Sequence, residues 1–196
     1  MQKENELMRK VIVHIQGMSD YSQSKLHETP KLNKETADDH ENRTWREKCS
    51  TDKEGNVKIP AMAFKLSLAA AAKKLGLQIA GRGKSTYTKY FEADVICEDD
   101  RGLSLPINKA DISSVRLPQN SDGVRGSGKR VFRTFPIVDG GWEVHATFSI
   151  MDDTITPDVF EEVFEAAGFG IGIGRWRPQN GGLNGRFKAL SYAWDE

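Results

Sequence analysis

The segment from Trp142 to Ile150 alternates apolar and polar side chains without a break, and no other feature constrains the fold as strongly. Its apolar positions are Trp142, Val144, Ala146, Phe148 and Ile150. The positions between them are Glu143, His145, Thr147 and Ser149. Alternation with a period of two is typical of a strand in an antiparallel sheet that is buried on one side. The chain is therefore expected to build a sheet with one covered face and one open face.

Further elements are predicted on both sides of this strand. A strand over 129–138 precedes it across the turn residues 139–141, so the two strands are expected to form a hairpin. A first strand is predicted over 9–16 and a last strand over 186–194. One helix is predicted over 61–75, where a proline in the first turn and a glycine at the end mark its limits. Another begins at Pro157, after the cap Thr156, and is expected to end at Gly168.

The order of these elements is strand, helix, hairpin, helix, strand. This order is the split βαβ, or ferredoxin-like, arrangement, which is also the arrangement of RRM-like modules. It is an α+β fold with the helices on one face of a four-stranded antiparallel sheet. The 196 residues suit a single domain over 1–196, with two large insertions at approximately 18–59 and 77–128.

Composition excludes several classes of protein. Lys and Arg together number 28, and so do Asp and Glu, so neither a uniformly basic nucleic-acid binder nor an acidic tail protein fits. The mean hydropathy is −0.55, and no apolar run approaches the roughly 18–20 residues that span a bilayer. Cys49 and Cys97 stand alone, and residues 1–10 lack the apolar core of a secretory signal. We therefore expect a reduced cytoplasmic protein without a membrane partner, disulfide, bound metal or cofactor.

A glycine-rich segment, 168–185, connects the second helix to the last strand and carries the strongest local signal. Seven of its eighteen residues are glycine, and no acidic residue occurs between Glu165 and Asp195. Glycine lets the backbone approach a ligand and expose N–H groups, arginine binds phosphate, and an aromatic ring stacks on bases. The predicted nucleic-acid contacts here are Gly172, Gly174, Arg175, Trp176, Arg177, Gly182, Arg186 and Lys188. The alternative is a flexible surface loop whose arginines are solvated.

Two further basic segments are candidates for phosphate binding. The segment 73–90 holds five basic residues and no acid, and its predicted contacts are Arg82, Lys84 and Tyr87. The segment 116–133 holds five basic residues against one acid, and its predicted contacts are Arg125, Lys129, Arg130 and Arg133. Glycines near the end of the second segment predict a mobile loop that becomes ordered on binding. Ordinary basic surface loops are the alternative for both.

His14 on the first strand and His145 on the alternating strand share the parity of the polar face. In the split βαβ arrangement these strands are neighbours, so the two imidazoles are expected to approach each other. A histidine pair can serve as general acid and base on a ribose 2′-hydroxyl, as in metal-independent RNA cleavage. The alternative is that both are simply polar residues of a sheet that faces solvent or RNA.

Three segments resemble the RAMP superfamily, which includes backbone and crRNA-processing subunits of CRISPR effector complexes. They are GFGIGIGR at 168–175, GGLNGRF at 181–187 and the first strand, VIVHIQG, at 11–17. The resemblance implies binding along single-stranded nucleic acid, often by a row of repeated subunits. Backbone-type members carry a larger thumb-like insertion than is evident here, so a stand-alone, phage-encoded relative is an equal alternative.

The sequence therefore predicts a non-catalytic protein that binds single-stranded RNA or DNA, as a homo-oligomer or as a subunit of a larger complex. One alternative is a metal-independent endoribonuclease that uses His14 and His145. Another is a phage or CRISPR-related protein-interaction module, which predicts a protein partner and no nucleic acid.

Overall fold

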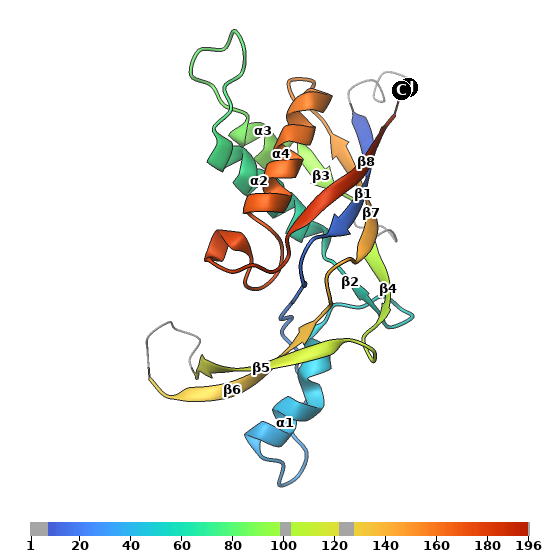
Figure 1. Ribbon diagram of the computed structural model, residues 1–196, viewed down its shortest axis with the longest axis vertical. Coiled ribbons are helices and arrows are strands. Elements are labelled where there is room, and N and C mark those ends of the chain that lie inside the picture. The colour runs from blue at the N-terminus through green and yellow to red at the C-terminus, as the bar shows by residue number, and fades with distance from the viewer. Residues whose placement is uncertain (1–7, 99–102, 122–127, 196) are drawn as a thin grey trace.

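The computed structural model describes residues 8–98, 103–121 and 128–195 (Figure 1). Its strands are β1 (Arg9–Gly17), β2 (Asn56–Lys58), β3 (Val95–Cys97), β4 (Ser104–Asn108), β5 (Ser113–Asn120), β6 (Arg130–Ile137), β7 (Glu143–Ile150) and β8 (Phe187–Trp194). Its α-helices are α1 (Ala37–Thr44), α2 (Ala61–Leu75), α3 (Thr88–Ala93) and α4 (Pro157–Gly170). Two 3-10 turns are η1 (Trp45–Lys48) and η3 (Pro178–Asn180). The α+β class with antiparallel sheets is thus confirmed.

A four-stranded sheet with the strand order β3-β7-β1-β8 forms the larger part of the molecule. β1 lies in its centre and pairs antiparallel with β7 on one side and β8 on the other. One face of this sheet is buried against α2 and α4, where the rings of Phe148 and Phe160 lie 5.4 Å apart and those of Phe64 and Phe187 lie 5.4 Å apart. The alternation in β7 therefore has the predicted cause, since one of its faces meets the helices and the other carries exposed polar side chains.

The prediction that 129–138 and 142–150 pair as a hairpin is wrong. β6 pairs over its whole length with β5, from Ser113↔Ile137 to Asn120↔Arg130, while β3 pairs with β7. β3 lies within 77–128, which the sequence predicts as an insertion. The reason is that the end of this segment has another partner. Tyr21 and Val138 exchange two backbone hydrogen bonds of 2.8 Å, so the residue after β6 pairs with the segment that follows β1.

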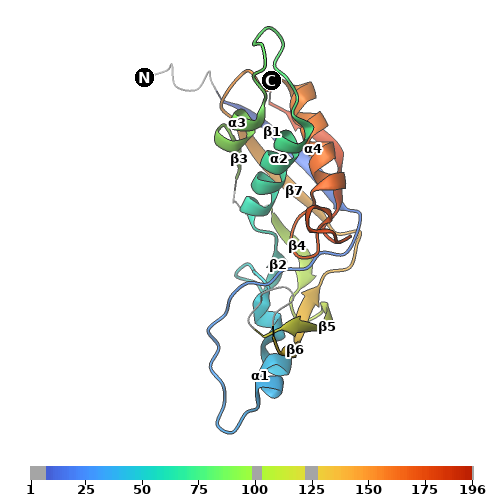
Figure 2. The same cartoon turned by 90° about the vertical axis from the view of Figure 1, so that its left-hand side faces the viewer.

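The β5–β6 ribbon, formed by these two strands, extends away from the sheet and its helices (Figures 1 and 2). α1 and η1 pack against β6, and the small β2–β4 sheet lies between this region and the larger sheet. The molecule is consequently elongated, with helices α2 to α4 at one end and α1 with the ribbon at the other (Figure 2).

Gly168 does not end α4, contrary to the prediction, because the helix continues to Gly170. A Cβ atom at Gly168 would overlap the carbonyl oxygen of Phe187, so this glycine allows α4 to lie directly against β8. Thr156 caps the helix as predicted, since its side chain accepts a hydrogen bond from the N–H of Val159. No helix in the described ranges is both long and apolar enough to cross a membrane.

Candidate nucleic-acid interface

The glycine-rich segment 168–185 is held in place by backbone hydrogen bonds. The N–H of Arg175 donates to the carbonyl of Ser22 at 2.8 Å, and the N–H of Gly185 donates to that of Asp20 at 2.6 Å. Within the segment, the N–H of Ile173 donates to the carbonyl of Gly185 at 2.9 Å. The segment is therefore anchored to the chain that follows β1, and its arginines project from a fixed backbone.

The glycines of this segment allow close packing within the protein. A Cβ at Gly182 would overlap the carbonyl oxygen of Trp176, and a Cβ at Gly174 would overlap that of Ser22. The N–H groups of Gly172 and Gly182 donate to protein carbonyls at 2.8 and 3.1 Å. The predicted role of these two N–H groups in holding a nucleic acid is therefore corrected, since both already have partners.

Phe135 of β6 joins the glycine-rich segment to the β5–β6 ribbon. The ring of Trp176 lies edge-on to it with centroids 5.2 Å apart, and the guanidinium carbon of Arg175 lies 3.9 Å from its centroid. The ammonium of Lys48 lies 4.8 Å from the same ring. The glycine-rich segment and β6, which are far apart in the sequence, thus meet at one place, which we call the loop–ribbon junction: Arg175, Trp176 and Arg177 together with Phe135.

The arginines of the junction lack carboxylate partners among the described residues. Arg175 is partly buried, its Nε has no hydrogen-bond partner in the described protein, and burial lowers its pKa. The Nε of Arg177 donates to the amide oxygen of Gln179 at 3.1 Å, and the guanidinium of Arg186 lies 4.5 Å above the ring of Phe169. Among the described residues these three arginines therefore have no carboxylate partner, and the Nε of Arg175 is itself shielded from solvent.

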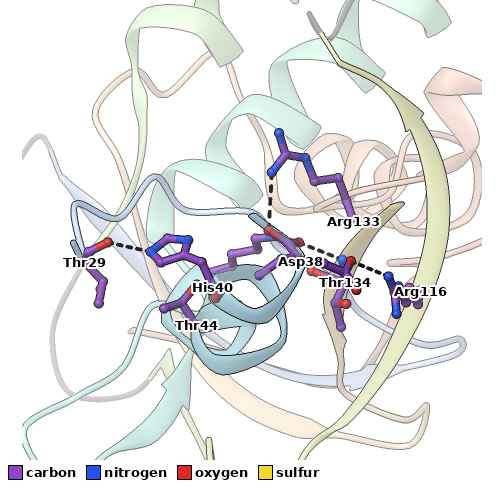
Figure 3. Close-up of polar contacts among 9 residues, drawn as sticks. Thr29, Asp38, His40, Thr44, Arg116, Arg133 and Thr134 are labelled. Carbon is purple, nitrogen blue, oxygen red and sulfur yellow. Dashed lines mark hydrogen bonds and ion pairs between the residues drawn. The ribbon is translucent and has the colours of Figure 1, made fainter. Parts of the chain in front are cut away.

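The base of the ribbon is fixed by the buried carboxylate of Glu41 on α1, which contacts Arg133 and Thr134 of β6. Figure 3 labels these two residues of β6. Its Oε1 accepts hydrogen bonds from the ammonium of Lys48 and, at 2.7 Å, from the N–H of Thr134. Its Oε2 lies 3.5 Å from the guanidinium of Arg133. Burial alone would raise the pKa of Glu41, but these hydrogen bonds outweigh burial and the net pKa is lowered.

The basic residues of the ribbon differ in how available they are. Arg133 shares the carboxylate of Glu41, whereas Lys129 and Arg130 are exposed and form no ion pair with another described residue. Arg125 lies outside the described residues. Lys188 is exposed at the start of β8, opposite Gln16 of β1.

The structure does not bring Arg82, Lys84 and Tyr87 to the junction. They belong to the connection between α2 and α3, at the opposite end of the helical part of the molecule from the glycine-rich segment (Figure 1). Arg82 donates to the hydroxyl of Tyr90 at 2.7 Å, and Lys84 is exposed. Tyr87 is only 8 % exposed, so its predicted role as a stacking plane is corrected: its ring belongs to the core.

His14 and His145 lie opposite each other in the β1–β7 pairing, on the open face of the sheet. Their rings are stacked, with centroids 4.2 Å apart and planes inclined by 11°. Nε2 of His14 is 3.0 Å from a carboxylate oxygen of Glu143. The 4.2 Å between the two ring centroids is close to van der Waals contact, so no phosphodiester fits between the rings. The hydrogen bonds from Gln16 and His14 hold the pKa of Glu143 below its usual value.

Sequence reasoning missed the residues that hold β6 in place at the loop–ribbon junction. Glu41, Lys48 and Phe135 carry no local signal, because their roles depend on contacts between α1, η1 and β6. Phe169 stands inside the glycine-rich segment, and its lack of a periodic apolar partner could have marked it as exposed. Among the described residues, no group of three or more His, Cys, Asp or Glu side chains is arranged to hold a metal ion.

Neither a protein-family model nor a curated protein matches this chain. Among solved structures, it is similar to a chain of the type III-B Cmr-beta complex bound to cognate target RNA, with a TM-score of 0.50 and 11 % identity. The alignment covers 96 % of this chain but only 61 % of that one. Cmr6 from Pyrococcus furiosus is also similar, with a TM-score of 0.48 and 11 % identity over 95 % of this chain and 100 % of that one. At 11 % identity, the first similarity shows that the two chains share a fold.

Proposed function

We propose that this protein binds single-stranded nucleic acid at the loop–ribbon junction. One observation carries the proposal: Arg175 is partly buried and has no carboxylate partner among the described residues. A partly buried guanidinium without a counter-ion is unfavourable, and a phosphate at the part of Arg175 that solvent reaches would supply the opposite charge. Arg177 lies two residues further along the same fixed backbone, so successive phosphates of one strand can be bound by neighbouring arginines.

The strand order supports a finer description of the fold. In the order β3-β7-β1-β8, the sequence β1–α2–β3 and β7–α4–β8 forms two interleaved βαβ units, which is the split βαβ arrangement. We propose that this ferredoxin-like unit is the scaffold on which both the glycine-rich segment and the β5–β6 ribbon are mounted. The segments 18–59 and 98–138 then act as additions to one domain.

RNA is the nucleic acid to test first, because the similar Cmr-beta chain comes from a complex bound to target RNA. By the same similarity, we propose that the protein works as a subunit of a larger assembly or as repeated copies along a strand. The neutral net charge fits this mode of binding, since attraction is confined to one surface and does not extend over the whole protein.

Fluorescence anisotropy with labelled single-stranded RNA and DNA over a series of salt concentrations tests the proposal. Arg175→Gln should weaken binding about 10-fold or more, the worth of a charge-assisted hydrogen bond, and lower the salt slope by about 0.7 for one lost phosphate contact. Lys84→Gln is the matched control, because it removes one exposed positive charge at the opposite end of the molecule. It should leave both quantities close to those of the wild type.

Two results would contradict the proposal. The first is the absence of measurable binding of either nucleic acid at about 50 mM salt, where electrostatic contacts are strong. The second is an equal loss in the Arg175 and Lys84 variants, which would mean that only bulk charge matters. Recovery of intact RNA after incubation in EDTA separates binding from the endoribonuclease alternative, which the stacked histidines do not favour.

A further inference from the structure

Two aromatic side chains stand apart from the rest because they are exposed. Among the aromatic residues that the structure describes, only Phe132 and Phe169 are more than about a third exposed, at 57 % and 67 %. Each carries a guanidinium over its ring: Arg116 lies 5.2 Å from the centroid of Phe132, and Arg186 lies 4.5 Å from that of Phe169. An exposed ring covered by arginine is an unusual use of a large apolar residue, and it resembles the surface of a stacking site.

Phe169 lies in the glycine-rich segment and is not part of the core. It occupies the last turn of α4, and Arg186 immediately precedes β8. In the same segment, Leu183 is 75 % exposed. The ring and the guanidinium therefore stand together on the surface, close to the cations already assigned to phosphate binding.

The charges around Phe169 favour an anionic, aromatic ligand. Lys74 at the end of α2 is close by, since a Cβ at the neighbouring Gly170 would lie 3.3 Å from its ammonium. The nearest acid along the helix, Glu165, accepts a hydrogen bond from the hydroxyl of Tyr192 at 3.0 Å. A site with Arg186 over the ring and Lys74 beside the next residue, Gly170, matches a base joined to phosphates, whereas an apolar peptide would leave both cations without partners.

Trp176 is less suited to this task. It is only partly exposed, and its ring packs edge-on against Phe135. Stacking of a base on Trp176 would compete with that contact, whereas Phe169 has no aromatic partner among the described residues and carries the guanidinium of Arg186 over its ring.

We propose that Phe169 and Arg186 form a platform on which one base of the bound single strand stacks, while Lys74 contacts an adjoining phosphate. This inference rests on the proposed function and adds a contact that depends on the base rather than on charge. The planar guanidinium can stack on the base, or move aside so that the base lies on the ring. In either case the platform fixes one nucleotide relative to the phosphates at the loop–ribbon junction.

The experiment uses single-stranded RNA and DNA that carry 2-aminopurine, whose fluorescence is quenched when it stacks. Phe169→Ala should weaken binding about 5- to 150-fold, the range for loss of one stacked base, and should reduce the quenching. Because no phosphate contact is lost, the salt slope should stay that of the wild type. Phe169→Trp should restore both the affinity and the quenching, since any flat aromatic ring serves.

Leu183→Ala is the matched control, because it also removes a highly exposed apolar side chain from this segment but no ring. It should bind like the wild type. If the wild type binds nucleic acid but Phe169→Ala binds equally well, or if Phe169→Trp fails to restore binding, the platform is refuted while the proposed function stands. If the wild type binds only a protein, both proposals fail together. Thermal melts confirm that the variants are folded, as expected for changes at exposed positions.

Discussion

Replacing Glu41 should show that a buried ion pair holds the β5–β6 ribbon to α1. The Glu41 and Lys48 side chains are 7 % and 10 % exposed, and they are joined by a hydrogen bond at the base of β6. Lys48 also donates to the carbonyl of Thr134 at 2.7 Å, while Glu41 accepts from the N–H of the same residue. Both backbone polar groups of Thr134, its N–H and its carbonyl, are therefore bonded to this pair.

The size of the effect follows from what each change leaves behind. Glu41→Gln keeps an oxygen that can accept from the N–H of Thr134 but removes the negative charge, so the Lys48 ammonium stays buried without a counter-ion. Breaking one partner of a buried pair costs about 3–5 kcal/mol of the free energy of unfolding. In the double variant Glu41→Gln/Lys48→Met no buried charge is left unpaired, since Arg133, which also loses its carboxylate, is 46 % exposed. We expect a cost of about 1–2 kcal/mol, mainly from the hydrogen bond lost at the Thr134 carbonyl.

Urea denaturation of the wild type, both single variants and the double variant at pH 7 measures these free energies as a double-mutant cycle. The double variant should be more stable than Glu41→Gln alone. Refutation would come from additive losses, with a coupling below about 0.5 kcal/mol, because the two side chains would then act independently. The stabilisation by Glu41 should be fully present at a pH above 4.5, the ordinary pKa of a glutamate. It should disappear as the pH falls through the lowered pKa that Glu41 has in the folded protein.

Two further predictions concern the glycine-rich segment and the open face of the four-stranded sheet. Gly185→Ala should lower the melting temperature far more than Gly181→Ala: both glycines have a positive φ, but a Cβ would overlap a backbone carbonyl only at Gly185, whereas Gly181 has open space. Equal shifts in thermal melts would show that the close approach is unimportant. Glu143→Gln should destabilise the protein at pH 7 but not at low pH, because hydrogen bonds from Gln16 and His14 lower the pKa of Glu143, and the resulting stabilisation is lost as the pH falls through that value. Urea denaturation at both pH values measures the difference, which should be independent of pH if these contacts contribute nothing.

Local patterns sufficed for most single elements of the fold. Strict alternation identified β7, and Thr156 marked the start of α4 because capping depends only on neighbouring residues. The hairpin failed because pairing is decided by competition between distant segments. Nothing near Val138 indicates that Tyr21 will bond to it, and that contact directs β6 to β5 instead of β7.

The candidate site was predictable in its residue types but not in its arrangement. Arg175 and Arg177 stand out from composition alone, and the parity of the strands was enough to place His14 opposite His145. The burial of Tyr87 was not evident from the sequence. A segment rich in basic residues has the composition of a surface loop whether its tyrosine ring is exposed or packs in the core. The glycines were recognised as close-approach positions, but their neighbours turned out to be the protein's own backbone.

The central position of β1 has a consequence for how the chain reaches its folded state. β1 ends at Gly17, and its partner β8 begins at Phe187, 170 positions further along the chain. During synthesis both edges of β1 therefore stay unpaired until β7 has been made, and one edge stays unpaired until β8 has been made. Sheets closed by such distant partners fold slowly, and an unpaired edge can pair with other chains in the meantime. The segment that carries Arg175 is accordingly fixed only after β8 has been made, because it connects α4 to this strand. The proposed binding at the loop–ribbon junction therefore requires β8 to be in place.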